Sequence, residues 1–176
     1  MDKHIILTGF MGVGKSTVGP RVAERLGLPF IDLDADIARA TGLACDFYIR
    51  RFGLEAFRKW ERRLLTHALR QPPLVLIPGG GIVLDMDNRR QILQKGVVVW
   101  LKAPKRVLLE RLHNEVRPLL TEKDRSEQIE QLLKDRWPYY QECHHSIETA
   151  FLNPDQVAEQ IISYVQNRST PSVVSL

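Results

Sequence analysis

Gly9-Phe10-Met11-Gly12-Val13-Gly14-Lys15-Ser16 fits the pattern G-x-x-x-x-G-K-S/T. The apolar run His4–Thr8 precedes this segment, and a helical pattern over Lys15–Leu26 follows it. In that setting the glycines let backbone N–H groups turn inward on phosphates, and the helix start adds positive potential. We expect Lys15 to reach the β- and γ-phosphate oxygens and Ser16 to ligate Mg²⁺. A plain glycine-rich turn with a solvated lysine does not account for both flanking elements.

Strand-like and helix-like segments alternate along the rest of the chain. Because the strands are short, apolar and bounded by glycine or proline, they are typical of a sheet covered on both faces. The predicted strands are His4–Thr8, Pro29–Leu33, Leu74–Pro78, Val97–Leu101 and His145–Thr149. The predicted helices are Lys15–Leu26, Asp34–Ala40, Glu55–Leu69, Met86–Gln94, Lys105–Leu112, Ser126–Tyr140 and Pro154–Gln166. The repeated β–α order predicts an α/β fold with a parallel sheet.

Length and composition predict one domain. With 176 residues and 44% hydrophobic side chains, the chain has enough apolar material for one substantial core, which we place at residues 1–166. Residues 113–124 are polar and contain Pro118, so we expect a mobile lid over a site, although a surface connection would have the same composition. Residues 167–176 are expected to form a flexible C-terminal tail.

Charge and composition also limit the classes of partner. No apolar run approaches the roughly 20 residues that span a bilayer, and the charged N-terminus is unlike a secretory leader, so we expect a cytoplasmic protein without membrane contact. Cys45 and Cys143 lack the spacing of zinc or redox motifs. The net charge of +4 is spread without a long basic run, which favours a small anionic ligand over nucleic acid.

Two aspartates, Asp32 and Asp34, follow the second predicted strand. In an open parallel sheet, ligands lie at the carboxyl ends of the strands, and strand alternation would give both carboxylates one face. One of them can hold Mg²⁺ beside Ser16, while the other can accept a proton or hydrogen bond from a substrate hydroxyl. Asp34 has the alternative of capping the helix that follows.

Further candidates lie on a predicted helix and after the third strand. Arg58 and Glu61 are three residues apart, so they share a helix face, as a simple surface ion pair would. The triplet Gly79–Gly81 follows the strand directly, and its lack of side chains lets backbone at Gly80 and Gly81 approach a ligand. A tight strand exit is the alternative for the glycines.

Two more arginines complete the set of cations. Arg117, in the expected lid, can neutralise charge on a transferring phosphoryl group, and Arg136 offers a planar fork that matches a carboxylate. Either residue alone would be consistent with a solvated surface. Together with Arg58 they suit an acceptor that carries its own carboxylate.

These motifs, in this order, resemble the shikimate kinase family. The resemblance runs from Ile5 to about Ile162. The matching segments are Gly9–Ser16, Asp32 with Asp34, Gly53–Glu61, Gly79–Gly81, Arg117–Leu120 and Arg136–Tyr140. The resemblance implies a three-layer αβα P-loop NTPase fold in the nucleoside monophosphate kinase style, with a central five-stranded parallel sheet and a mobile lid. It further implies a monomer that uses Mg²⁺ and transfers the γ-phosphate of ATP to the 3-hydroxyl of shikimate in aromatic amino acid biosynthesis.

The resemblance also implies roles for individual residues. Lys15, Asp34 and Arg117 would be catalytic, and Ser16 with Asp32 would hold Mg²⁺. The ATP-binding residues would be Gly12, Val13, Gly14, Lys15, Ser16, Thr17, Arg111 and Arg117, with Arg111 near the base. The shikimate-binding residues would be Asp34, Arg58, Gly80 and Arg136. Gly81, the next residue of the glycine triplet, is a further candidate for this site.

The chain departs from the family pattern after Gly42. Ala44–Ile49 replaces a different apolar segment, and Ile49 stands where an aromatic residue commonly lines the acceptor pocket. A kinase of a related polyhydroxy acid such as aminoshikimate is therefore an alternative. A catalytically silent, nucleotide-binding regulatory protein is another, although the expected catalytic positions are filled.

Overall fold

The computed structural model describes residues 2–112 and 125–169, and the elements below lie in those ranges. The strands are β1 (His4–Gly9), β2 (Phe30–Asp32), β3 (Val75–Ile77), β4 (Gly96–Lys102) and β5 (His145–Glu148). The α-helices are α1 (Lys15–Leu26), α2 (Leu33–Thr41), α3 (Cys45–Phe52), α4 (Leu54–Ala68), α5 (Met86–Lys95), α6 (Lys105–Leu112), α7 (Arg125–Tyr140) and α8 (Pro154–Ser169). A 3₁₀ helix, η1 (Ile82–Leu84), precedes α5.

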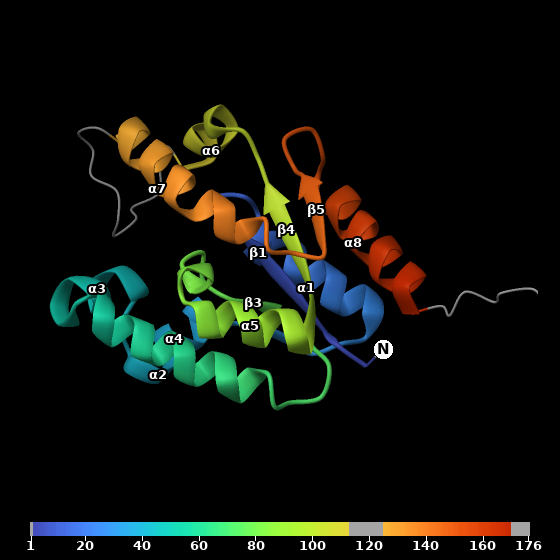
Figure 1. The fold of residues 1–176 in the computed structure, drawn as a ribbon, viewed down its shortest axis with the longest axis horizontal. Helices are drawn as coiled ribbons and strands as arrows, with labels where there is room; N and C mark the ends of the chain where they lie inside the picture. Colours follow the sequence, from blue (N-terminus) through green and yellow to red (C-terminus); the bar gives the residue numbers. More distant parts are fainter. Residues whose placement is uncertain (1, 113–124, 170–176) are drawn as a thin grey trace, which may run out of the picture.

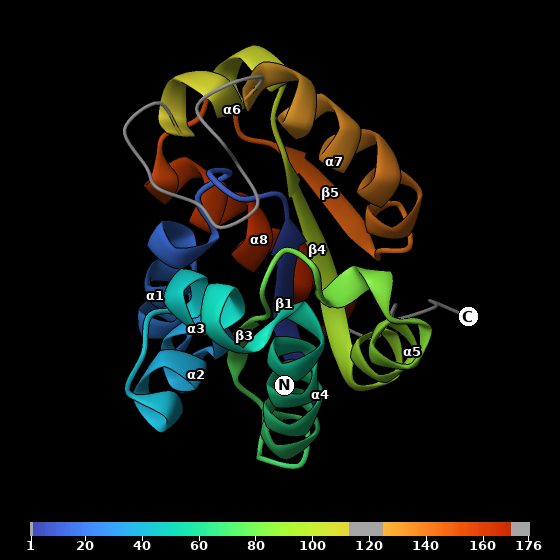
Figure 2. The ribbon, with the colours of Figure 1, turned by 90° about the vertical axis from the view of Figure 1, so that its left-hand side faces the viewer.

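The five strands form one parallel sheet in the order β2-β3-β1-β4-β5. β1 lies at the centre, and its core residues Ile5, Ile6 and Leu7 are fully buried. Because all strands run the same way, their carboxyl ends meet at one edge. In Figure 2 the strands run up the picture toward this edge, with α6 and α7 above, α2 to α4 lower, and the segment after β3 between them. The topology therefore brings the chain segments after β1, β2 and β3 together.

Helices cover both faces of the sheet. α1 packs on β1, β2 and β3 and also against α8, while α5 packs on β4 from the other side together with α4. Figure 1 shows this arrangement, with α1 and α8 on one side and α4, α5 and α7 on the other. The strands are apolar in continuous runs because neither face meets water. The predicted three-layer α/β architecture with a five-stranded parallel sheet is confirmed.

The predicted elements match the observed ones to within two residues at all but one end. That end belongs to α8, which continues to Ser169, so residues 167–169 extend the helix instead of beginning a tail. Arg168 accounts for the extension, since its guanidinium donates to the Tyr164 hydroxyl at 2.8 Å and lies over that ring. Residues 170–176 and the expected lid, 113–124, lie outside the described residues. α3 was not predicted, because its eight residues include the strand-favouring Phe47, Tyr48 and Ile49.

In the described ranges, 2–112 and 125–169, no helix is both long enough and apolar enough to cross a membrane.

Candidate active site

The loop between β1 and α1 has the geometry of a phosphate cradle. Gly12 and Gly14 have φ angles of 76° and 100°, a left-handed region that glycine adopts without strain. Gly14 precedes α1 directly, so the N–H groups at the start of the helix face the loop. The buried Lys15 ammonium donates to the carbonyl oxygens of Gly9 and Phe10, at 2.8 and 2.9 Å. The lysine therefore points along the inside of the loop.

Asp32 has two separate tasks at the end of β2. Its Oδ1 accepts hydrogen bonds from the backbone N–H groups of Asp34 (3.1 Å) and Ala35 (3.4 Å), which caps α2. Its Oδ2 accepts from the Ser16 hydroxyl at 2.9 Å. The expectation that strand alternation aligns the two aspartates is thus wrong, because β2 ends at Asp32 and Asp34 lies in the first helical turn. The cap comes from Asp32, and the alternative cap role for Asp34 is not seen.

A cavity of about 400 Å³ extends from the phosphate loop toward the acceptor residues. Predicted nucleotide and acceptor residues share this cavity, and its lining includes Gly12, Val13, Gly14, Lys15, Ser16 and Thr17 together with Asp34, Gly80 and Arg111. Arg111 is fastened beside the loop, since its guanidinium donates to the hydroxyl and carbonyl oxygens of Thr149 at 3.2 and 3.1 Å. Thr149 is buried at the end of β5 and was not singled out from the sequence.

Each position of the glycine triplet lacks a side chain for a separate reason. A Cβ atom on Gly79 would lie 2.8 Å from Asp34 Oδ1 and 2.9 Å from Glu61 Oε1, so both carboxylates converge there. On Gly81 it would overlap the guanidinium of Arg58. None of the three glycines has a positive φ, so at Gly79 and Gly81 the close approach of side chains, not turn geometry, excludes a Cβ. At Gly80 the atom nearest to a Cβ would be the backbone carbonyl oxygen of Gly9, at 3.3 Å. The tight-turn alternative does not explain the triplet.

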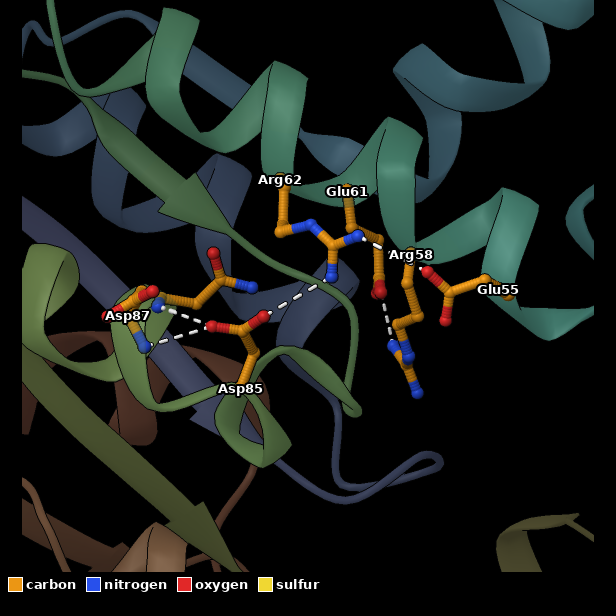
Figure 3. A network of polar contacts seen from close by, with 7 residues as sticks. Glu55, Arg58, Glu61, Arg62, Asp85 and Asp87 are labelled. Carbon is orange, nitrogen blue, oxygen red and sulfur yellow. Dashed lines mark hydrogen bonds and ion pairs between the residues drawn. The ribbon is translucent and has the colours of Figure 1, made fainter.

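Arg58 and Glu61 form a buried ion pair on α4. Their side chains are 17% and 1% exposed, so the pair is not the surface contact that sequence spacing alone would suggest. Burial raises the pKa of the Glu61 carboxyl, while the charge of Arg58 and its hydrogen bond act in the opposite direction. Figure 3 shows the two side chains together below α4 and Arg62 reaching to Asp85 at the start of α5. Glu61 thereby orients the Arg58 guanidinium.

Arg136 lies across the glycine triplet from α4. It is 3% exposed, its guanidinium carbon is 5.7 Å from the centre of the Phe10 ring, and one of its terminal nitrogens lies near Gly80. Its Nε has no hydrogen-bond partner among the described residues. A buried guanidinium with donors to spare is suited to a planar anion such as a carboxylate. Arg58 and Arg136 thus reach the glycine triplet from α4 and α7 respectively.

The unpredicted helix α3 is tied to the acceptor side of the site. The Cys45 thiol, at its first residue, donates to the backbone carbonyl of Asp34 at 3.2 Å. Burial, and then the charges of Asp34 and Asp32, raise the pKa of this thiol to about 12. The thiol therefore stays protonated as a donor and is not a nucleophile. The segment Ala44–Ile49 is in this way anchored beside Asp34.

The structure leaves one predicted catalytic residue unplaced. Arg117 lies outside the described residues. All other predicted site residues lie at the carboxyl edge of the sheet or on α4, α6 and α7, which flank it. Tyr140, at the end of α7, was quoted only as part of a motif, yet its hydroxyl donates to the carbonyl oxygen of Gly80 at 2.6 Å.

Comparisons with known proteins agree with this geometry. A family model described as shikimate kinase matches residues 11–166. The shikimate kinase of Paramagnetospirillum magneticum is 39% identical over 97% of this chain and 90% of its own length, and that of Thermodesulfovibrio yellowstonii is 38% identical over 95% and 97%. The solved structure of a shikimate kinase from Acinetobacter baumannii, in complex with shikimate, superposes with a TM-score of 0.92, at 34% identity and 97% coverage of both chains. A gluconokinase from Sinorhizobium meliloti, with 18% identity and a TM-score of 0.63, shares the fold.

Proposed function

This chain belongs to the shikimate kinase family and is an ATP-dependent kinase, and we propose that the two ends of its cavity hold ATP and shikimate. The observation that carries the proposal is the convergence of Asp34, Arg58 and Arg136 on the glycine triplet, at the acceptor end of a cavity whose other end is the phosphate loop. The carboxylate and hydroxyls of shikimate and the phosphates of ATP would then each face protein groups that complement them.

The nucleotide end provides charge and backbone donors. We place the ATP phosphates against the backbone of residues 12–17, with Lys15 exchanging its two carbonyl partners for phosphate oxygens. Arg111 lines the cavity beside the loop, where its guanidinium donates to the Val13 carbonyl at 3.4 Å, and it is the candidate for contact with the base. Arg117 is the candidate for a second cation at the transferring phosphoryl group.

Kinases of this family work with a divalent metal ion, which we propose to be Mg²⁺ held by Ser16 and Asp32. The fit rests on chemistry: a hydroxyl and a carboxylate oxygen 2.9 Å apart are hard oxygen ligands next to the phosphate loop. Bound there, the ion would neutralise charge on the phosphate oxygens. The cap bonds hold Asp32 in place independently of the ion, because they use its other oxygen.

The acceptor end positions shikimate for in-line transfer. Arg58 and Arg136 bind the carboxylate, Glu61 holds Arg58 in orientation, and the backbone at Gly80 and Gly81 allows the ring to approach. Asp34 accepts the hydrogen bond of the attacking hydroxyl and takes its proton as the bond to phosphorus forms. Positioning and charge stabilisation carry most of the rate.

A coupled ADP-release assay tests this function. With ATP and Mg²⁺ we expect turnover of shikimate, loss of activity on chelation, and a lower kcat/KM with an aminoshikimate. A preference for the amino analogue would reassign the acceptor and implicate the segment Ala44–Ile49. Tight ATP binding without ADP release, for any hydroxy acid, would contradict the proposal and favour a regulatory protein.

Gly81→Ala tests the acceptor end without straining the backbone. Gly81 has a φ of −94°, so alanine fits the backbone, but its Cβ displaces the Arg58 guanidinium, the far end of a flexible side chain. We expect the KM for shikimate to rise roughly 10- to 100-fold while the KM for ATP is unchanged. In an Arg58→Ala background the same change should have no further effect, because the colliding group is absent. An equal loss in both backgrounds would contradict this explanation.

We also propose that the domain, residues 1–166, acts as a monomer in the cytoplasm. The resemblance supports this assignment, and light scattering of the purified protein tests the oligomeric state.

A further inference from the structure

The segment 79–84, which we call the glycine loop, carries Gly80 and Gly81 and has no side chains at its first three positions to hold it. Its own hydrogen bonds include those from the N–H groups of Ile82 and Leu84 to the carbonyls of Gly79 and Gly81. Those bonds set its local shape but not its distance from α7. The acceptor site needs that distance to be constant, because Arg58 meets the loop from α4 and Arg136 meets it from α7.

Tyr140 makes the first connection between α7 and the loop. Its hydroxyl donates to the Gly80 carbonyl at 2.6 Å, and its ring, 1% exposed, stacks on Trp100 of β4 with centroids 6.0 Å apart. Burial raises the pKa of Tyr140 to about 12, so the hydroxyl remains a donor throughout the working pH range. Arg136 is one helical turn earlier on the same face, and a Cβ on Gly80 would lie 3.5 Å from the Tyr140 hydroxyl and 3.6 Å from Arg136 Nη1.

Arg89 of α5 makes the second connection, at the other end of the loop. Its Nη1 donates to the Val83 carbonyl at 2.7 Å, and its Nε donates to Glu142 Oε2 at 3.0 Å, two residues beyond α7. The guanidinium also lies over the Tyr139 ring, 4.4 Å from its centre, and the side chain is only 12% exposed. One planar fork therefore joins α5, the glycine loop and the end of α7.

We propose that Tyr140 and Arg89 are positioning residues that fasten the last turn of α7 to both ends of the glycine loop and so hold Arg136 opposite Arg58. Neither residue touches the acceptor in this arrangement. Both act by fixing the position of the Arg136 guanidinium relative to Gly80. The inference rests on the proposed function, since it concerns the shikimate end of the site.

Tyr140→Phe is the conservative test, because it removes only the hydroxyl. We expect the KM for shikimate to rise about tenfold with the KM for ATP unchanged, since in the part of the chain that the structure describes neither the Tyr140 hydroxyl nor the Arg89 guanidinium is hydrogen-bonded to the phosphate loop. Arg89→Met should do the same, and Arg89→Lys should be intermediate, because an ammonium can pair with Glu142 but cannot also reach Val83 and stack on Tyr139. Arg90→Ala, an exposed neighbour on α5, is the control and should match the wild type.

A double-mutant cycle separates positioning from mere stability. If Tyr140 works through Arg136, then adding Tyr140→Phe to Arg136→Gln should not raise the KM for shikimate further. An unchanged KM for shikimate in a folded Tyr140→Phe protein would overturn the proposal, as would an equal rise in the KM for ATP. A multiplicative effect in the double variant would also overturn it. Failure of the wild type to phosphorylate shikimate would instead refute the proposed function, so the two outcomes are distinguishable.

Discussion

Asp34→Asn is expected to lower kcat by about 10²- to 10⁴-fold, the usual contribution of a positioned general base. Asparagine keeps the size of the side chain but cannot accept the proton of the attacking hydroxyl. The helix cap should survive, because Asp32 and not Asp34 makes it. The KM for ATP and the unfolding temperature should therefore stay close to the wild-type values. Steady-state ADP release and a thermal melt measure the two effects separately.

Asp36→Asn is the matched control for this change. Asp36 lies on the same helix, and its carboxylate pairs with Arg39 at 2.7 Å, away from the cavity lining. We expect its kcat to equal that of the wild type. Near wild-type turnover of Asp34→Asn would show that Asp34 has no catalytic role, and a loss of ATP binding would show that its role is in the nucleotide site.

Arg136→Gln is expected to weaken the use of shikimate by on the order of 10²-fold in kcat/KM, since a buried partner of the acceptor carboxylate is removed. Glutamine keeps a donor but loses the charge and the fork. The KM for ATP should not change, because Arg136 lies beside Gly80 and is not among the residues that line the cavity at the phosphate loop. Initial rates over a matrix of ATP and shikimate concentrations give both constants.

An acceptor analogue without the carboxylate makes this test specific. The wild type should use the analogue poorly, and Arg136→Gln should use it no worse than the wild type does, since the lost interaction needs both partners. Lys134→Gln, an exposed residue on the same helix, serves as the control. If Arg136→Gln lost activity equally on both acceptors, the residue would stabilise the fold and would not bind the carboxylate.

The strand and helix pattern could be predicted because local signals were strong. The first predicted helix, Lys15–Leu26, has the observed ends, since the P-loop fixes its start and Gly27 its end. The short helix α3 lacks such signals, because Ala44 provides no side-chain cap and three of its eight residues, Phe47, Tyr48 and Ile49, favour strands. Packing on α4 stabilises it, and packing across the chain is not a local property.

The candidate site could be predicted where residues follow strand ends directly. Asp32, Asp34 and Gly79–Gly81 were found in this way, because the carboxyl ends of parallel strands share an edge. The separate roles of the two aspartates, with Asp32 capping α2 and Asp34 at the acceptor end, could not be predicted, because they depend on the residue at which the strand ends. Likewise the bonds from Tyr140 to Gly80 and from Arg89 to Glu142 join segments 60 and 53 residues apart, which leave no periodic pattern in the sequence.

The glycine triplet also bears on how this site can change over generations. Two of the glycines are required by side chains, Asp34 and Glu61 at position 79 and Arg58 at position 81, whereas the atom nearest to a Cβ on Gly80 is the backbone carbonyl oxygen of Gly9, at 3.3 Å. A lineage that replaced Gly79 or Gly81 would need a compensating substitution among those side chains, and two of them, Glu61 and Arg58, are themselves an ion pair. Positions 79 and 81 should therefore covary with the residues at 34, 58 and 61, whereas position 80 meets backbone, although the three glycines read as a single motif in the sequence.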